Sequence, residues 1–151
     1  MGKQSAGLLP YRRRNGVVEV FLVHPGGPFW AKKDSAGWSI AKGEFSEEED
    51  PLAAALREFG EETGFTLAGV FQPLGSLRQS GGKTVHAWAI EQELDEEAMV
   101  SNTFELEWPP RSGKLTEFPE IDRAAWFTLE TAAEKLHKGQ VEFLSRLESM
   151  L

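Results

Sequence analysis

Apolar positions near the start of the chain are grouped in the manner of β-strands. Residues 6–11 and 17–24 are mainly apolar, the second segment is rich in β-branched side chains, and the polar residues 12–16 lie between them. This pattern predicts a β-hairpin. The sequence Pro-Gly-Gly-Pro at residues 25–28 ends the second strand and begins a loop. After this loop, the short apolar segment 38–40 is expected to form another strand.

The next segment carries the start and stop signals of a helix. Asp50 is suited to the N-cap, and Pro51 can take the first helical position because the N–H group that proline lacks is not needed there. Strong helix formers follow at residues 53–57, and Gly64 stands where a left-handed glycine would end the helix. We therefore expect one helix between Pro51 and Gly64.

The second half of the chain shows both the alternation typical of strands and the spacing typical of helices. Within residues 65–94, apolar and polar side chains alternate along 84–90, and Ser-Gly-Gly at 80–82 offers a turn from a preceding strand. The remaining predictions are a partly extended loop at 101–113, a strand at 125–129, and helices at 129–137 and 140–151. No repeat or linker interrupts this pattern, so a single α/β domain over residues 1–151, a sandwich with a mixed sheet, is expected.

Composition narrows the class of protein. A chain of 151 residues has the size of one ordinary domain. The absence of cysteine excludes a disulfide scaffold, a thiolate zinc site and a cysteine nucleophile. No apolar leader precedes the first strand, and no run of 18 apolar residues occurs. We therefore expect a cytoplasmic protein with no membrane partner.

Charge is distributed unevenly along the chain. The net charge of −8 disfavours a nucleic acid as partner, since such a surface is normally basic. Residues 43–65 hold eight acids and one base, whereas residues 1–42 hold seven bases and two acids. An acidic segment beside a basic one suits a metal and phosphate site, although a solvated charged surface is the simpler explanation.

The acids of the predicted helix share one face. At about 100° per residue, Glu58, Glu61 and Glu62 cluster away from the apolar face, which is formed by Leu52, Leu56 and Phe59. Carboxylates at this spacing repel one another, and no Lys or Arg interleaves with them to relieve the repulsion. The pattern fits either a solvated face or the oxygen ligands of a hard cation such as Mg²⁺.

The surrounding residues resemble a complete Nudix box, the signature of hydrolases that cleave nucleoside diphosphates linked to another group. Its fixed identities are all present: Gly43, Glu49, Arg57, Glu58, Glu61, Glu62 and Gly64. Phe59 and Phe65 occupy its two hydrophobic positions. The resemblance implies a Nudix-type α/β/α sandwich with a loop-helix-loop catalytic segment.

The same resemblance assigns expected roles to these residues. Glu58 and Glu62 would be the principal Mg²⁺ ligands, with Mn²⁺ as a substitute, and Glu61 would bind directly or through water. The Lys42 carbonyl, beside Gly43, would add a backbone oxygen. Glu49 and Arg57 would tie the loop to the helix, although an ordinary surface ion pair is the alternative for these two.

Outside the box, members of the family often recruit a later acid as metal ligand or general base. Glu120, which precedes Trp126 by six residues, resembles that acid. Its neighbouring competitors are Glu105, Glu107 and Glu117. Basic residues that could neutralise a polyphosphate are Arg78, Lys83, Arg111 and Lys114. His86 is expected to be structural, and Trp30, Trp38 and Trp88 are candidates for either a base-stacking or a core position.

The expected function is Mg²⁺-dependent hydrolysis of a phosphoanhydride bond in a small-molecule nucleotide. Residues 38–43, Trp-Ser-Ile-Ala-Lys-Gly, resemble the Trp-x-x-Pro-Lys-Gly entry of diadenosine polyphosphate hydrolases and some nucleoside triphosphate pyrophosphohydrolases, with Ala41 in place of proline. Two alternatives stay open: a Nudix-fold module that binds a nucleotide without turnover, and an acidic interaction domain without a ligand.

Overall fold

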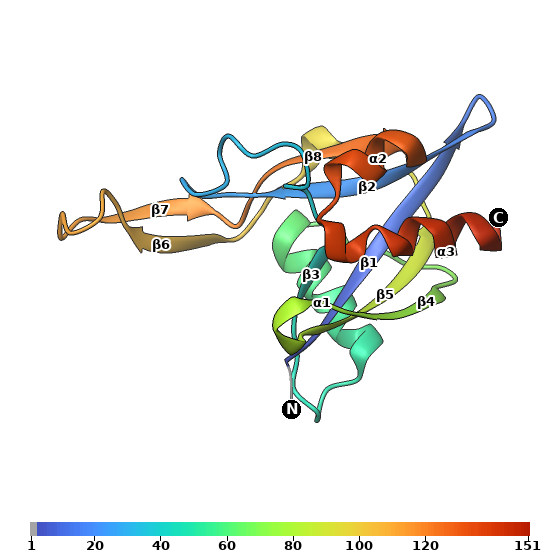
Figure 1. Ribbon diagram of the computed structural model, residues 1–151, viewed down its shortest axis with the longest axis horizontal. Coiled ribbons are helices and arrows are strands. Elements are labelled where there is room, and N and C mark those ends of the chain that lie inside the picture. The colour runs from blue at the N-terminus through green and yellow to red at the C-terminus, as the bar shows by residue number, and fades with distance from the viewer. Residues whose placement is uncertain (1–2) are drawn as a thin grey trace.

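The computed structural model describes residues 3–151 and places one mixed β-sheet at the centre of the molecule (Figure 1). The sheet has six strands in the order β4-β5-β1-β2-β8, and β3 pairs with β1 beside this path. β1 and β5 run parallel, whereas the other neighbours are antiparallel. The strands of this sheet are β1 (Gln4–Arg14), β2 (Val17–Pro25), β3 (Ala41–Glu44), β4 (Gln72–Arg78), β5 (Thr84–Glu91) and β8 (Ile121–Thr128).

The first strand organises the sheet. β1 forms the predicted hairpin with β2 through Asn15 and Gly16, which have φ values of 53° and 78°. An Asn-Gly pair with positive φ suits the tight turn of a hairpin because its twist matches that of the strands. The early residues of β1 pair instead with β3, with Ala6 opposite Gly43 and Gly7 opposite Lys42. The sheet therefore fixes the position of the residues that precede the helix.

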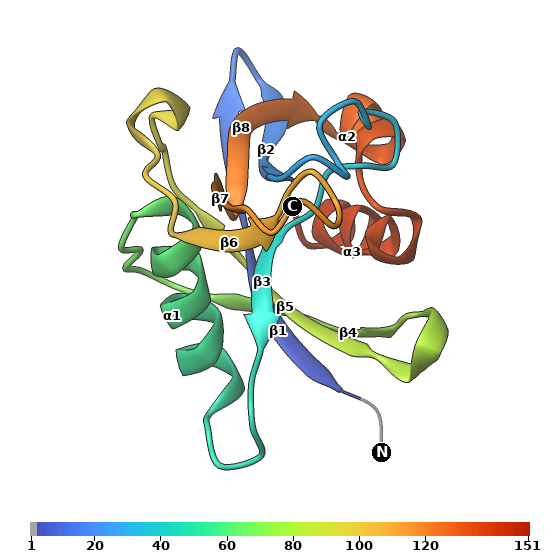
Figure 2. The same ribbon diagram turned by 90° about the vertical axis from the view of Figure 1, so that its left-hand side faces the viewer.

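Helices cover both faces of the sheet, and this arrangement confirms the α/β/α sandwich (Figure 2). The helix α1 (Pro51–Thr63) packs on one face with Phe21 of β2, and α3 (Glu142–Met150) packs on the other with Leu9 and Leu22. The short helix α2 (Leu129–Lys135) also lies on this second face. None of the helices within residues 3–151 has the length and apolar character required to span a membrane.

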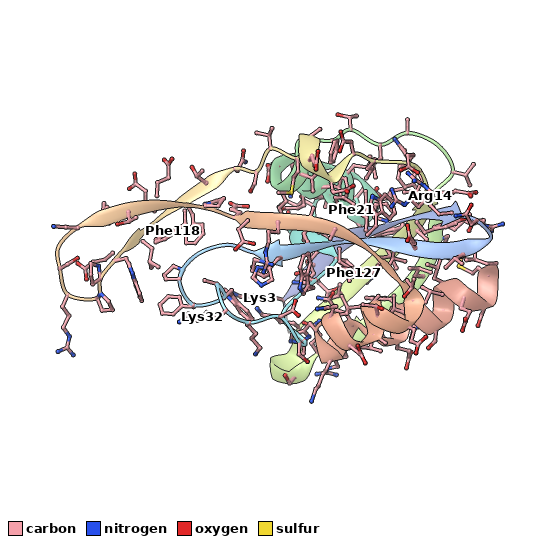
Figure 3. All side chains as sticks on the ribbon, turned by 90° about the horizontal axis from the view of Figure 1, so that it is seen from above. Lys3, Arg14, Phe21, Lys32, Phe118 and Phe127 are labelled. Atoms are coloured by element: carbon pink, nitrogen blue, oxygen red, sulfur yellow. The ribbon has the colours of Figure 1, made fainter. Side chains whose placement is uncertain are left out.

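The segment predicted as a loop at residues 101–113 is different in the structure. It contains β6 (Thr103–Glu107), which pairs with β7 (Leu115–Pro119) in a two-stranded ribbon that projects from the body (Figures 1 and 3). Phe104 and Phe118 lie opposite each other, with ring centroids 6.0 Å apart. The prediction missed the ribbon because residues 108–110, Trp-Pro-Pro, favour a loop, although Phe104 and Leu106 alternate with polar residues as in a strand.

Two further boundaries differ from the predictions. Residues 38–40 were expected to form a strand, but Trp38 and Ser39 make only isolated bridges, and the strand begins at Ala41. β8 begins at Ile121 and is longer than the strand predicted at 125–129. Its first half carries Asp122 and Arg123, and these charges hid it from a pattern based on apolar residues.

Candidate functional site

The ends of α1 are fixed by the residues that predicted them. The Asp50 carboxylate accepts a hydrogen bond from the Ala53 N–H group at 3.0 Å, and Gly64 has a φ of 79°. Between these caps, Ala54, Ala55 and Phe59 are buried against the sheet. The rotation of the helix about its axis is therefore determined, and so is the direction of its carboxylates.

Arg57 joins the loop to the helix. Its Nε and Nη2 atoms donate to the two Glu49 oxygens at 2.9 Å each, a bidentate pair that lowers the pKa of Glu49 through these hydrogen bonds. Its Nη1 atom also donates to Glu58 at 2.8 Å and to Glu61 at 3.5 Å. The expectation that no base relieves the acidic face was therefore wrong, because Arg57 reaches both acids along the helix surface.

Glu58 lies over the glycine that opens the box. A Cβ atom built on Gly43 would stand 2.0 Å from both Cδ and Oε2 of Glu58, far inside van der Waals contact. The side chain of Glu58 is only 15% exposed. The absence of a side chain at Gly43 is thus what allows the Glu58 carboxyl group to approach β3.

Glu62 is the least expected member of the acidic face, because it is buried. The residue is 7% exposed, and this burial, together with the like charges of Glu58 and Glu120, raises its pKa to about 8, while Lys42 opposes the shift. Burial likewise raises the pKa of Glu58, against its hydrogen bond from Arg57. The helix therefore has two carboxyl groups whose ionised forms lack sufficient positive charge around them.

This burial predicts a pH dependence of the metal-free protein. The pKa of Glu62 is about 8 in the folded protein and 4.5 ordinarily, so the folded state binds the extra proton between these values and stability falls as pH rises through that window. The full penalty is on the order of 3 to 5 kcal/mol. In chelator, the melting temperature of Glu62→Gln should exceed that of wild type by a margin that grows from about pH 5 to about pH 8.5. A margin that stays constant or shrinks over this range would show that Glu62 ionises freely in the folded protein.

Lys42 connects the acidic face to two adjoining cavities. One, of about 230 Å³, is also lined by Glu62 and Glu120, and the other, of about 270 Å³, by Trp30 and Lys83. Pro25, Ser39 and Lys42 line both. Burial lowers the pKa of the Lys42 ammonium, and Lys83 acts in the same direction, whereas Glu62 opposes it. The cavities together form one depression with acids at one end and cations and a tryptophan at the other.

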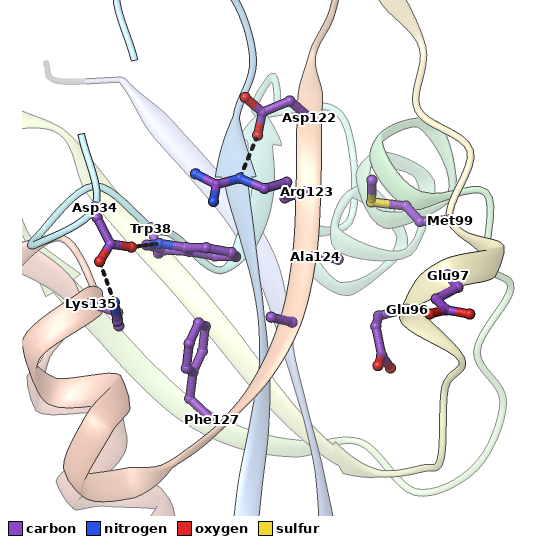
Figure 4. Close-up of a pocket in the computed structure, with 11 residues that line it drawn as sticks. Asp34, Trp38, Glu96, Glu97, Met99, Asp122, Arg123, Ala124, Phe127 and Lys135 are labelled. Atoms are coloured by element: carbon purple, nitrogen blue, oxygen red, sulfur yellow. Dashed lines mark hydrogen bonds and ion pairs between the residues drawn. The ribbon is translucent and has the colours of Figure 1, made fainter. Parts of the chain in front are cut away.

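A larger cavity, of about 580 Å³, lies elsewhere in the molecule. It crosses β8 and is lined by Trp38, Arg123 and Phe127, with Glu96 and Glu97 on its far side (Figure 4). None of the predicted site residues except Trp38 lines it. We therefore place the candidate site at the smaller cavities, one of which is lined by the buried Glu62 and by Glu120.

The structure separates the remaining candidates. Glu120 lies at the junction of β7 and β8 and faces the same cavity as Glu62, whereas Glu105, Glu107 and Glu117 lie on the ribbon. Of the predicted bases, Lys83 lines the neighbouring cavity, Arg78 ends β4, and Arg111 and Lys114 lie in the turn of the ribbon.

The aromatic candidates differ in their contacts and exposure. His86 bonds through Nε2 with the Gln4 side chain at 2.7 Å, in agreement with a structural role. Trp30 is 36% exposed and lines the cavity, Trp38 is buried beside it, and Trp88 packs in the core. Trp30 is therefore the tryptophan with a face available to a ligand.

Sequence reasoning missed part of the cavity wall. Gln79, His137 and Gln140 line the cavity with Trp30 although they are far apart in the chain. Gln140 is 2% exposed, and its Oε1 atom accepts from the Ile40 N–H group at 3.0 Å. In the sequence, Gln140 is only a polar residue at the start of a predicted helix. Its burial and its contact with Ile40 are seen only in the structure.

The donor set fits a divalent cation by its chemistry. Across residues 3–151, no three carboxylates or imidazoles converge as ligands of one ion, and Arg57 bonds with Glu58 and Glu61. Nevertheless, Glu62 is buried, Glu58 is partly buried, both lie near further acids, and their carboxyl groups are oxygen donors suited to Mg²⁺. A cation there would compensate charge that the protein itself leaves uncompensated.

Comparisons with known proteins agree with this fold. A family model described as NUDIX domain matches residues 1–147, whereas no curated protein matches the chain. A C. elegans Ap4A hydrolase in a binary complex has 23% identity and a TM-score of 0.64, with 98% of this chain and 96% of that chain covered. The NUDIX domain of Shewanella oneidensis NrtR, solved with ADP ribose, has 13% identity and a TM-score of 0.69, with 99% and 88% covered.

A mutT/nudix family protein from Listeria innocua is also similar, with 19% identity, a TM-score of 0.60, and coverage of 98% of this chain and 92% of that chain. At these identities the solved structures support the fold alone. The family model, in contrast, spans nearly the whole sequence and includes the acidic helix. The chain therefore belongs to the NUDIX domain family.

Proposed function

We propose that this protein, acting as a single domain over residues 1–151, is a Mg²⁺-dependent hydrolase of a phosphoanhydride bond in a nucleotide. The observation that carries the proposal is the buried Glu62, which shares a cavity with Glu120 and Lys42. Burying a carboxylate among other acids destabilises the empty protein, and a divalent cation offsets that cost. A merely solvated acidic face has no reason to bury Glu62.

The acids of α1, Lys42 and Glu120 would have separate roles in the reaction. Glu58 and Glu62 would hold Mg²⁺, with Glu61 bound directly or through water and the Lys42 carbonyl adding an oxygen. When bound, the cation neutralises phosphate charge and lowers the pKa of water. Glu120, an exposed residue that lines the same cavity, would accept a proton from the attacking water.

Arg57 positions these groups and does not touch the substrate. Its bidentate bond to Glu49 and its bond to Glu58 fix the loop and the carboxyl group relative to each other. Fixed carboxylates hold the reacting atoms within the narrow geometry that in-line displacement at phosphorus requires.

The adjoining cavity suits the nucleoside end of a substrate. Trp30 offers an aromatic face, and the ammonium groups of Lys42 and Lys83 line the same space. A base can stack on the indole while the phosphates lie toward the cations. The cavity leads past Lys42 to Glu62, so a phosphate chain bound there extends toward the acids.

Among nucleotides, we propose dinucleoside polyphosphates or nucleoside triphosphates. The support is the likeness of residues 38–43 to the corresponding segment of diadenosine polyphosphate hydrolases, together with the Ap4A hydrolase among the similar structures. The similarity to the NUDIX domain solved with ADP ribose keeps a second candidate, a module that binds a nucleotide without turnover. The complete set of box carboxylates favours the enzyme.

A substrate panel tests the proposal. Dinucleoside polyphosphates, canonical and oxidised nucleoside triphosphates, nucleotide sugars and capped RNA are incubated with Mg²⁺, and the products are separated by chromatography. We expect cleavage within the first two classes. If diadenosine polyphosphates were the slowest class, the substrate assignment would be wrong; binding without cleavage of any compound would favour the module.

Gly43 provides a specific mutational test. In Gly43→Ala the new methyl group takes the space of the Glu58 carboxyl group, which must swing away, so we expect turnover to fall about 10²-fold while the fold is kept. The matched control is Gly60→Ala on α1, where an added Cβ atom meets nothing closer than the Phe65 oxygen at 3.8 Å. Steady-state rates and circular dichroism of both variants give the comparison. Equal activity in the two variants would show that contact between Glu58 and Gly43 is irrelevant.

A further inference from the structure

A buried histidine supports the loop that carries Trp30. His24 has no exposed surface, and a bulge between His24 and Pro25 marks the point where β2 gives way to the loop. Its Nε2 atom lies 2.6 Å from the Lys33 carbonyl oxygen, which can only accept, so Nε2 carries a proton and donates it. Its Nδ1 atom lies 2.8 Å from Asp122 Oδ1 on β8. Both ring nitrogens thus have a partner, and the partner of Nε2 lies in a loop that is otherwise exposed.

The histidine bonds to the turn that presents the tryptophan. The Lys33 N–H group donates to the Trp30 carbonyl at 3.0 Å, and this bond closes a turn over residues 30–33. The Lys33 ammonium lies 5.4 Å from the centre of the Trp30 ring. His24 therefore contacts the turn at Lys33. The N–H group of Lys33 closes the turn, and its ammonium group lies over the Trp30 ring.

Other bonds hold the loop only on either side of this turn. The Gly26 N–H group donates to the Glu120 carbonyl at 2.8 Å, and Asp34 bonds with Trp38 and Lys135 (Figure 4). Among the hydrogen bonds of residues 3–151, His24 supplies the one that reaches residues 30–33 from outside the turn. The loop containing Lys32 follows the end of β2 in Figure 3, and a further contact before the turn is between Phe29 and Trp108, with ring centroids 5.5 Å apart.

We propose that His24 is a positioning residue for nucleotide binding: it fixes the Trp30–Lys33 turn and thereby the tryptophan wall of the cavity. The inference rests on the proposed function, because it takes that cavity as the nucleoside site. Without the His24 bond the turn keeps only its internal bond between Lys33 and Trp30, and Trp30 samples positions outside the cavity. The His24 side chain bonds with neither the acids of α1 nor Glu120, so the step at phosphorus is unaffected once substrate is bound.

The test separates binding from turnover. For His24→Leu we expect KM for the best nucleotide of the panel to rise about tenfold, the effect of one lost buried hydrogen bond, with kcat within about twofold of wild type. His24→Gln can still donate to the Lys33 oxygen and should recover most of the affinity. A fall in kcat at unchanged KM, or no change in either, would overturn the proposal.

Two further variants guard against a purely structural explanation. Leu22→Ala, a fully buried neighbour on β2, should lower the melting temperature without raising KM. Trp30→Ala, in the exposed loop, should fold and raise KM as His24→Leu does, and the double variant should be no worse than Trp30→Ala alone. Additive effects, or a KM in Leu22→Ala as high as in His24→Leu, would contradict positioning through Trp30. If His24→Leu does not fold, His24→Met, which also lacks an N–H donor for the Lys33 oxygen, replaces it in the same cycle with Trp30→Ala.

Binding of an α,β-methylene analogue of ATP, measured by calorimetry, tests this inference independently of the proposed hydrolase activity. If wild type binds the analogue but cleaves no nucleotide, the proposed hydrolase is wrong, and His24→Leu should still weaken binding about tenfold. If wild type cleaves nucleotides and His24→Leu binds the analogue as tightly as wild type does, the inference about His24 alone is wrong.

Discussion

Glu58→Gln and Glu62→Gln should each lower turnover by roughly 10³-fold or more at saturating Mg²⁺ while leaving the fold intact. Glutamine keeps the size of the side chain but removes the charge that would hold a cation. Both acids have raised pKa values, because burial opposes their ionised forms, so neutral replacements relieve strain in the empty protein. Single-turnover rates and melting curves in chelator measure the two effects.

Controls for this result come from the loop before the helix. Glu47 and Glu48 are exposed acids outside the helical face, and their glutamine variants should retain wild-type rates. Near-wild-type activity of either Glu58→Gln or Glu62→Gln would refute the metal assignment. A large loss of melting temperature in chelator would instead show that the acids stabilise the fold, contrary to their burial.

The local elements of the site could be predicted because short-range signals determine them. Asp50, Pro51 and Gly64 cap or bound α1 as expected, and Asn15-Gly16 closes the first hairpin. Each signal acts within a few residues, through a capping bond or a positive φ. The confirmed α/β/α fold follows from the same alternation of short strands and amphipathic helices.

The tertiary contacts of the site could not be predicted in the same way. The position of Glu58 over Gly43 depends on the pairing of β3 with the early half of β1, and the burial of Glu62 depends on that same packing. A helical wheel separates apolar from acidic faces, but it cannot show that a strand lies against part of the acidic face. For this reason the helical wheel left open either a solvated face or a set of cation ligands, and only the structure shows that Glu62 is buried.

The lining of the cavity with Trp30 could not be predicted either, because its residues are far apart in the chain. Trp30 precedes the helix, whereas Gln79 and Gln140 follow it by many residues, and all three line one wall. Nothing local links such positions, since the sheet order and the connection between α2 and α3 bring them together. Specificity for a substrate therefore depends on the parts of the chain that sequence patterns describe least well.

Mg²⁺ should raise the melting temperature of the wild-type protein. A cation that binds only the folded state adds about 2.7 kcal/mol at a hundredfold excess over Kd. For a chain of this size that is roughly 5–10 °C. The reason is specific to this site: Glu58 and Glu62 oppose folding when ionised and metal-free, so a bound cation both removes that penalty and adds ligand bonds. Scanning fluorimetry across a Mg²⁺ titration measures the shift.

Matched variants decide where the cation binds. The double variant Glu58→Gln/Glu62→Gln should give a nearly flat titration because the ligands are gone, whereas Glu47→Gln/Glu48→Gln should respond like wild type. Both variants lower the negative charge by the same amount, so general screening by added salt would affect them equally. If the loop variant lost the response and the helix variant kept it, the cation would bind outside α1. The roles proposed for Glu58, Glu61 and Glu62 would then have to pass to other acids.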